Sequence, residues 1–112
     1  MSSLPIRDLR FETTDVGQNI KSSKRLYKWS FYLKDNMHKI ELFQSRVSGK
    51  RKIMHNGNFI FEDLSYSNDF SHSFNVEKYD CNLVQLDFDR FELRIMNRPF
   101  SNLIEEGKNI FK

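Results

Sequence analysis

Short runs in which hydrophobic and polar residues alternate recur along the chain. The clearest run is Leu26–Leu33, in which bulky apolar residues take every second position and Lys28 and Ser30 stand between them. A period of two is typical of a strand with one buried and one solvated face. The buried face of this strand is predicted to hold Tyr27, Trp29, Phe31 and Leu33.

Further runs of the same kind follow at short intervals. The segment from His38 to Leu42 places Ile40 and Leu42 on one face. Other extended runs are 52–55, 59–61, 70–76, 81–88 and 91–95. About seven short strands with almost no helical period predict an all-β fold, an antiparallel β-sandwich.

A tight turn is predicted at Asn56-Gly57, between two of these runs. Both central residues of a type I′ hairpin turn need a positive φ, and Asn-Gly meets that need at the lowest cost. The turn fixes the register of the following strand, and we expect Phe59 and Phe61 to share its buried face.

The two ends of the chain lack a strong period. The N-terminal part has only sparse apolar residues among polar ones, which predicts an extended arm over residues 1–24. The β-sandwich domain is predicted over residues 25–103, and a C-terminal tail, also extended, over 104–112. One short helical turn is expected around Leu103-Ile104, with Ser101 as its cap.

Composition narrows the class of protein. The chain has 112 residues, which fits one domain, and its one cysteine, Cys81, has no partner for an internal disulfide. A buried thiol in a cytoplasmic, reducing compartment is the simplest interpretation. No apolar run approaches the ~20 residues that span a bilayer, and no secretory signal is recognisable. Residues 1–56 carry 12 Lys and Arg against 5 Asp and Glu, whereas residues 57–112 carry 6 against 10.

No constellation for catalysis, a cofactor or a metal is recognisable, so an enzyme is not expected. The histidines are predicted on different strands, without the spacing of a metal site: His38, His55 and His72. Ser48-Gly49-Lys50-Arg51 is not a phosphate-binding loop, because a strand follows it in place of a helix. Strand alternation and a nearby turn explain a small acidic cluster as surface charge: Asp87, Asp89 and Glu92.

A basic turn is the best candidate for a binding site. Its candidate partner-binding residues are Arg46, Lys50, Arg51 and Lys52. Binding residues concentrate on turns, and this one suits an acidic protein surface, an anionic lipid or a nucleic acid. The alternative is a solvated turn whose lysines discourage aggregation at a sheet edge. Nucleic acid is the weakest of the binding options, since no aromatic and basic RNA-recognition motif is present.

The order of motifs resembles the Fas apoptotic inhibitory molecule (FAIM) family. A Trp-led strand at Trp29 is followed by His38-Lys39-Ile40-Glu41 and then by Ser48-Gly49-Lys50-Arg51. Further on, Phe91–Ile95, a turn and Phe100 are similar to the family's closing hairpin. The resemblance covers roughly residues 27–103, one domain where usual family members have two. It implies a compact β-sandwich, no enzymatic activity and a role in restraining cell death.

These observations lead to a functional hypothesis with two alternatives. The preferred hypothesis is a non-catalytic protein-interaction module, a small structural subunit of a cytoskeletal assembly such as a ciliary microtubule lattice. Its partner would have an acidic surface, as tubulin does, and would meet the basic half of the chain. The resemblance implies instead a soluble cytoplasmic regulator of apoptosis or of protein aggregation. The third class is binding of anionic lipid or nucleic acid through the basic turn.

Overall fold

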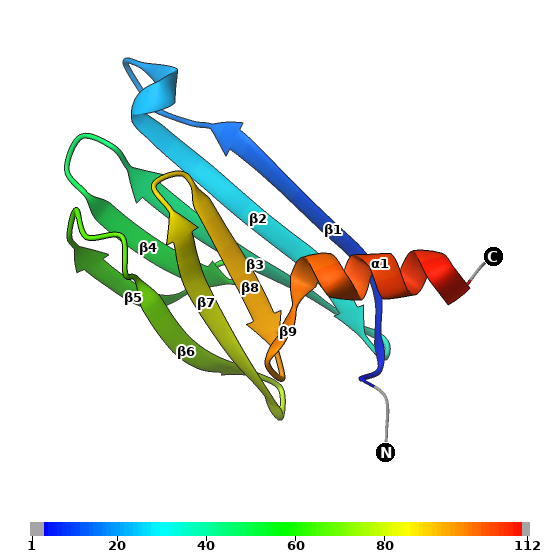
Figure 1. Ribbon diagram of the computed structural model, residues 1–112. Coiled ribbons are helices and arrows are strands. Elements are labelled where there is room, and N and C mark those ends of the chain that lie inside the picture. The colour runs from blue at the N-terminus through cyan, green and yellow to red at the C-terminus, as the bar shows by residue number, and fades with distance from the viewer. Residues whose placement is uncertain (1–3, 111–112) are drawn as a thin grey trace. The chain divides into compact units, whose positions relative to one another are not determined.

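The computed structural model describes residues 4–110, and residues 1–3 and 111–112 lie outside the described part. The chain divides into two compact units, Met1–Tyr66 and Ser67–Lys112. The first contains an antiparallel sheet of five strands, and the second contains an antiparallel sheet of four strands and a helix (Figure 1). The predicted fold class is confirmed as all-β with two antiparallel sheets, the components from which a β-sandwich is made.

The five-stranded sheet is a simple meander in which each strand pairs with the next along the chain. Its order is β1-β2-β3-β4-β5, and a single 3₁₀ turn, η1 (Lys21–Ser23), precedes β2. The strands are β1 (Ile6–Asp15), β2 (Lys24–Leu33), β3 (Asn36–Ser45), β4 (Lys50–His55) and β5 (Asn58–Leu64). Each connection joins neighbouring antiparallel strands, and the one between β1 and β2 is a longer loop that contains η1.

The core of this unit lies on one face of β2 and β3, as the alternation predicts. Tyr27, Trp29, Phe31 and Leu33 are all 2% exposed or less. Trp29 lies opposite Ile40 in the register of β2 and β3, and Ile40 is fully buried. Large aromatic side chains at alternating positions bury the most apolar area per residue, and they therefore supply most of the stabilisation of this sheet.

The N-terminal segment differs from the predicted arm. Ile6–Asp15 is extended, but it is strand β1, paired antiparallel with β2 along its length. Its register shifts between Arg7 and Arg10, where Asp8 has a φ of 55°, and this bulge interrupts the alternation. Phe11 lies across from Trp29 with the two rings stacked at 5.2 Å between centroids. An edge strand that is polar on both faces has little period-two signal, so the sequence did not reveal it.

The predicted Asn56-Gly57 turn is confirmed, with φ values of 50° and 81° between β4 and β5. The predicted burial of Phe59 is wrong, because its side chain is 62% exposed. The register of β4 and β5 shifts between Ile53 and Met54, and this irregularity places Phe59 opposite Met54. The bulge changes the orientation that simple alternation assigns to the strand.

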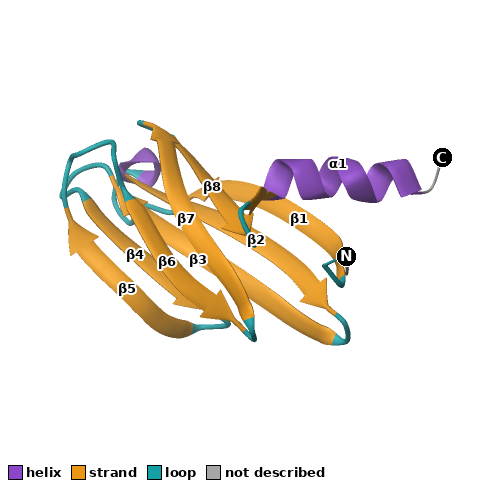
Figure 2. Cartoon of the chain, turned by 60° about the horizontal axis from the view of Figure 1, so that its bottom comes forward, coloured by secondary structure: helices purple, strands orange, loops and turns teal. Residues whose placement is uncertain are grey.

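The second unit is a four-stranded meander of order β6-β7-β8-β9. Its strands are β6 (Ser71–Val76), β7 (Tyr79–Asp87), β8 (Arg90–Ile95) and the short β9 (Arg98–Pro99). Figure 2 shows the helix α1 (Phe100–Ile110), which follows β9 directly. The core of this unit includes fully buried side chains from three strands: Val76, Leu83, Leu93 and Ile95.

The C-terminal segment differs from the predicted single helical turn. The helix extends over 11 residues, and Ser101 lies inside it and is not its cap. Phe100 and Leu103 are buried and are three residues apart, so they lie on one face of the helix. The predicted tail over 104–112 is therefore helical as far as Ile110, and its last two residues are outside the described part.

Candidate functional site

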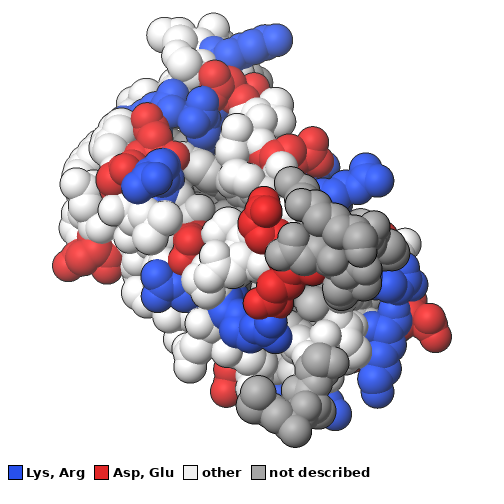
Figure 3. Space-filling view, turned by 45° about the vertical axis from the view of Figure 1, so that its right-hand side comes forward, with Lys and Arg blue, Asp and Glu red and all other residues white. Residues whose placement is uncertain are grey.

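Three loops of the five-stranded sheet converge at one end of it, and their residues define a surface that we call the basic end. It comprises residues 16–24, from the end of β1 to the first residue of β2, residues 45–50, from the last residue of β3 to the first of β4, and residues 64–66, at the end of β5. These segments contain four basic residues and no acidic residue: Lys21, Lys24, Arg46 and Lys50. By contrast, basic and acidic side chains are intermixed over much of the face shown in Figure 3.

Hydrogen bonds join the first two of these loops to each other. The backbone N–H of Arg46 donates to the carbonyl oxygen of Ser23 at 2.8 Å. The guanidinium Nη1 of Arg46 donates to the carbonyl oxygen of Ser22, also at 2.8 Å. Arg46 therefore fixes the position of the loop before β2, in addition to contributing its charge.

The third segment is tied to the loop between β3 and β4. Ser65 donates its backbone N–H to the carbonyl oxygen of Gly49 at 3.0 Å, and the Tyr66 hydroxyl donates to the carbonyl oxygen of Val47. Gly49 has a φ of 75°, and an added Cβ would lie 3.0 Å from the Ser65 carbonyl oxygen. Only glycine suits this close approach. The basic end is thus held in one arrangement before any partner binds.

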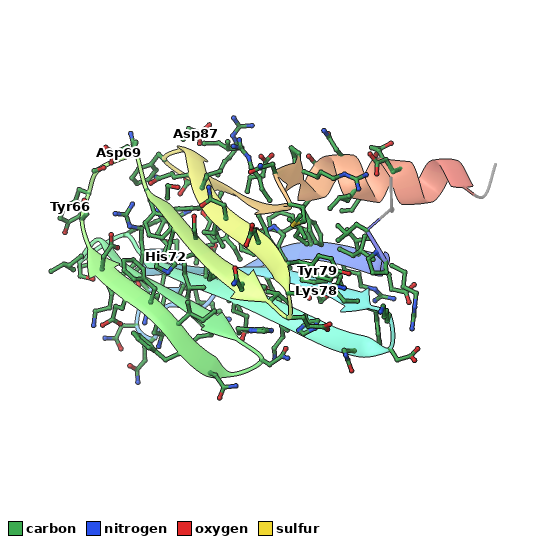
Figure 4. All side chains as sticks on the ribbon, turned by 90° about the horizontal axis from the view of Figure 1, so that it is seen from below. Tyr66, Asp69, His72, Lys78, Tyr79 and Asp87 are labelled. Atoms are coloured by element: carbon green, nitrogen blue, oxygen red, sulfur yellow. The ribbon has the colours of Figure 1, made fainter. Side chains whose placement is uncertain are left out.

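Apolar side chains project from the same loops. Ile20, Val47, Leu64 and Tyr66 are 67–72% exposed. Figure 4 shows the Tyr66 side chain at the periphery, directly after β5. A hollow of about 340 Å³ lies between the two longer loops, where Ile20 and Val47 are among its lining residues. Exposed apolar groups among basic ones are typical of a binding surface.

Two of the four residues predicted to bind a partner lie at the basic end, and two do not. Arg46 and Lys50 belong to the basic end, and Lys50 is exposed. Lys52 is half-buried, with its Nζ 5.2 Å from the centre of the Phe43 ring, one strand away. Arg51 is only 3% exposed, so the structure does not bring it to the binding surface.

Arg51 is occupied by an ion pair inside the first unit. Its Nε lies 3.1 Å from Oδ1 of Asp63, and its Nη2 lies 3.2 Å from Oδ2. Asp63 is the direct cross-strand neighbour of Arg51 in the register of β4 and β5. The two-pronged geometry matches the fork of a guanidinium to a carboxylate. Arg51 therefore has a structural role in joining β4 to the edge strand β5.

Sequence reasoning missed the half of the basic end that precedes β2. Ile20, Lys21 and Lys24 fell in the segment taken for an arm. A signal was present, because the stretch from Val16 to Lys34 contains five basic residues and no acidic residue. Such a run indicates a positively charged surface, whatever its secondary structure.

The three histidines lie on different strands, as predicted, and two of them meet across the neighbouring strands β3 and β4. Nδ1 of His38 and Nε2 of His55 are 2.9 Å apart, and one ring must donate while the other accepts. Burial lowers the pKa of His55, and the charge on His38 lowers it further. Among the described residues, no group of three side chains is suited to hold a metal ion.

We expect this pair to make the stability of the protein depend on pH. The folded-state pKa of His55 lies below its unfolded value of roughly 6.5, so its contribution to stability is present above that pH. We expect the free energy of unfolding to fall as the pH is lowered through the folded-state pKa, because burial disfavours the charged form of His55. Urea unfolding between pH 7.5 and 5 measures this, with H55Q as the variant in which the slope decreases. An unchanged slope in H55Q would contradict the assignment.

The other candidate groups are already engaged. The acidic cluster is paired within its own sheet, with Asp87 Oδ2 2.7 Å from Arg90 Nε and Glu92 Oε1 2.9 Å from Arg94 Nε. Cys81 is buried as predicted, and burial raises the pKa of its thiol to about 12. The thiolate that nucleophilic chemistry needs is therefore negligible at neutral pH.

Comparisons with known proteins assign the chain to a family. Residues 25–112 match the family described as Fas apoptotic inhibitory molecule (FAIM1). The match begins at Arg25, within β2, so β1 and the loop before β2 precede it. Searches of curated proteins and of solved structures gave no match. No helix among residues 4–110 is long and apolar enough to cross a membrane. The match covers most of the chain and agrees with the order of motifs in the sequence. The chain therefore belongs to the Fas apoptotic inhibitory molecule family.

Proposed function

We propose that the chain is a non-catalytic protein-interaction module that docks through its basic end on the acidic surface of a partner protein. The observation that carries the proposal is the combination at the basic end of four basic residues, no acidic residue and four prominently exposed apolar side chains. Opposite charges steer the encounter, and burial of apolar groups supplies lasting affinity.

The charge of the whole first unit supports the same partner. Residues 1–66 carry 12 Lys and Arg against 7 Asp and Glu, a net charge of +5. A field of one sign raises the rate of association with an acidic surface and makes binding sensitive to salt. The hydrogen bonds of Arg46 and Tyr66 keep the loops in place, so little ordering entropy is lost on binding.

The cytoskeletal setting predicted from the sequence makes microtubules the first acidic partner to test. We expect the purified chain to sediment with microtubules at low salt. The double variant K21E/K50E should weaken binding about tenfold or more, which corresponds to roughly 1.4 kcal/mol. The control K34E/K78E has the same net charge but changes turns outside the basic end. Equal weakening by both variants would contradict docking through the basic end, and no sedimentation at all would remove the microtubule setting.

Binding titrations with other ligands distinguish the alternative partners of the basic end. Vesicles with anionic headgroups and a short RNA are the comparison ligands, each titrated with the wild-type chain and with V47D. An apolar contact predicts that V47D weakens binding to the protein partner even when the salt is high. If vesicles bind more tightly than every protein partner, the lipid alternative replaces the proposal.

Membership of the family favours a second candidate function, which is regulation of cell death. The family is described as Fas apoptotic inhibitory molecule, and this chain would act in that role through protein contacts at its basic end. Expression in Fas-stimulated cells tests this role. Survival that rises with the wild-type chain and with K34E/K78E, but not with K21E/K50E, would support it. Survival that is unchanged by the wild-type chain would remove it.

A further inference from the structure

A row of three polar side chains crosses the face of the five-stranded sheet opposite the buried aromatic side chains of β2, away from the basic end. Arg10 on β1 is the cross-strand partner of Ser30 on β2, and Ser30 is the partner of Lys39 on β3. We call this the Arg10–Ser30–Lys39 row. All three residues line a groove of about 510 Å³ that lies over β1, β2 and β3. A volume of this size is within the range of small-ligand sites.

The donors of this row are largely unused inside the protein. Within residues 4–110, Arg10 makes no ion pair and the Ser30 hydroxyl makes no hydrogen bond. Lys39 has one long contact, with its Nζ 4.0 Å from Oε1 of Glu41. Ser30 is half-buried, so its hydroxyl has less access to water than an exposed one. Donors that have no partner inside the protein are available to an acceptor from a ligand.

The acidic groups around the groove are already paired. Oε1 of Glu12 lies 2.9 Å from Nζ of Lys28, and Oδ2 of Asp8 lies 2.5 Å from Nη1 of Arg7. These pairs neutralise the two carboxylates that line the groove. Arg10 has no ion-pair partner among the described residues, and Lys39 has only the long contact with Glu41. The charged groups around Ser30 therefore have a net positive charge.

We propose that the Arg10–Ser30–Lys39 row binds a phosphate monoester. A phosphate group is close to a dianion at neutral pH and offers three acceptor oxygens, which match two cations and one hydroxyl. Neighbouring strands place Cβ atoms about 5 Å apart, so the long side chains of Arg10 and Lys39 can meet above the short one of Ser30. The guanidinium fork of Arg10 provides the bidentate contact that phosphate prefers.

The rest of the groove suits the organic part of such a ligand. Tyr32 and Met37 line the groove beside the row, and Met37 is 48% exposed. The Arg7 guanidinium lies 4.4 Å from the centre of the Tyr32 ring, which holds that ring in place. A phosphate on a protein side chain and a phosphate on a small organic molecule share this chemistry, and the experiment distinguishes the two sources.

The test is a titration of the full chain with a fluorescent phosphoserine peptide, its unphosphorylated form, and glycerol phosphate as competitor. We expect binding that depends on the phosphate and is weakened tenfold or more by R10Q/K39Q. The control K34Q/K78Q has the same net charge, changes turns outside the basic end and should bind as the wild type does. A third variant, S30A, removes only the hydroxyl and should weaken binding by a few fold. All four proteins are compared by circular dichroism, since the changed side chains are on the surface.

The competition with glycerol phosphate identifies the source of the phosphate, and the variants test the site itself. If glycerol phosphate displaces the peptide only at far higher concentration than free peptide does, the source is a phosphorylated protein. If glycerol phosphate binds equally well, the source is a small organic phosphate, and the site stands. Absence of phosphate-dependent binding, or equal weakening by R10Q/K39Q and K34Q/K78Q, overturns the proposal. The basic end is untouched in R10Q/K39Q, so failure here leaves the proposed function intact.

Discussion

Replacing Trp29 by alanine is expected to lower the free energy of unfolding by about 3–5 kcal/mol, the largest effect of any single change proposed for this chain. Trp29 is 2% exposed and lies at the centre of the five-stranded sheet, between Tyr27 and Phe11. The substitution removes a large apolar area and leaves a cavity that rigid strands fill only in part. Urea unfolding followed by circular dichroism measures the loss, because Trp29 is the one tryptophan of the chain.

A double-mutant cycle isolates the part of this loss that holds β1 to β2. The Phe11 and Trp29 rings are stacked at 5.2 Å, and such a pair is worth about 0.5–1.5 kcal/mol beyond its burial. We expect F11A to be milder than W29A, since Phe11 is 44% exposed. F11A and W29A should show a coupling energy of that size. Strict additivity would mean that β1 is not docked on β2 as described.

Replacing Asp63 by alanine is expected to cost about 2–3 kcal/mol of stability. The carboxylate of Asp63 is the two-pronged partner of Arg51, whose side chain is 4% exposed. Removing one partner of a buried pair leaves a desolvated charge, a loss of roughly 3–5 kcal/mol when both groups are fully buried. We expect less here, because the Asp63 side chain is 32% exposed and water screens part of the interaction.

The matched variant R51M separates a structural role from a binding role. Methionine keeps much of the volume of arginine and removes the buried charge, so R51M/D63A should be more stable than D63A alone. R51M should also bind the acidic partner as tightly as the wild type does, whereas K50E should not. If a stable R51M protein no longer bound the partner, Arg51 would have to be a binding residue and not only a structural one.

The alternation of apolar and polar residues correctly predicted strands that have one buried face. The face of Tyr27, Trp29, Phe31 and Leu33 was read correctly, and so was the Asn56-Gly57 turn. Both signals are local, because burial sets the period of a strand and backbone strain selects the turn residues. The fold class follows from these elements.

The elements that were not predicted correctly depend on contacts between segments, which a local sequence pattern does not encode. Edge strand β1 has polar residues on both faces, and pairing with β2 makes it a strand. The helix gains from the burial of Phe100 and Leu103, which a short window does not predict. A bulge at Ile53 places Phe59 in solvent.

Only those parts of the candidate site that have a local sequence signal could be predicted. The turn between β3 and β4 and the charges of Arg46 and Lys50 were found from sequence. The burial of Arg51 also follows from the sequence in retrospect, because consecutive residues of a strand alternate between faces. The contribution of Ile20 and Lys21 required the fold, since only hydrogen bonds between loops bring these residues beside Val47.

Docking through the basic end can be located residue by residue from amide NMR shifts of the labelled full chain during titration with a glutamate-rich peptide. Docking through the basic end predicts that the largest shifts fall in residues 16–24, 45–50 and 64–66. They should weaken as salt is raised and should be lost in K21E/K50E but not in K34E/K78E. Shifts concentrated in the second unit, or spread evenly over all lysines and arginines, would contradict the account.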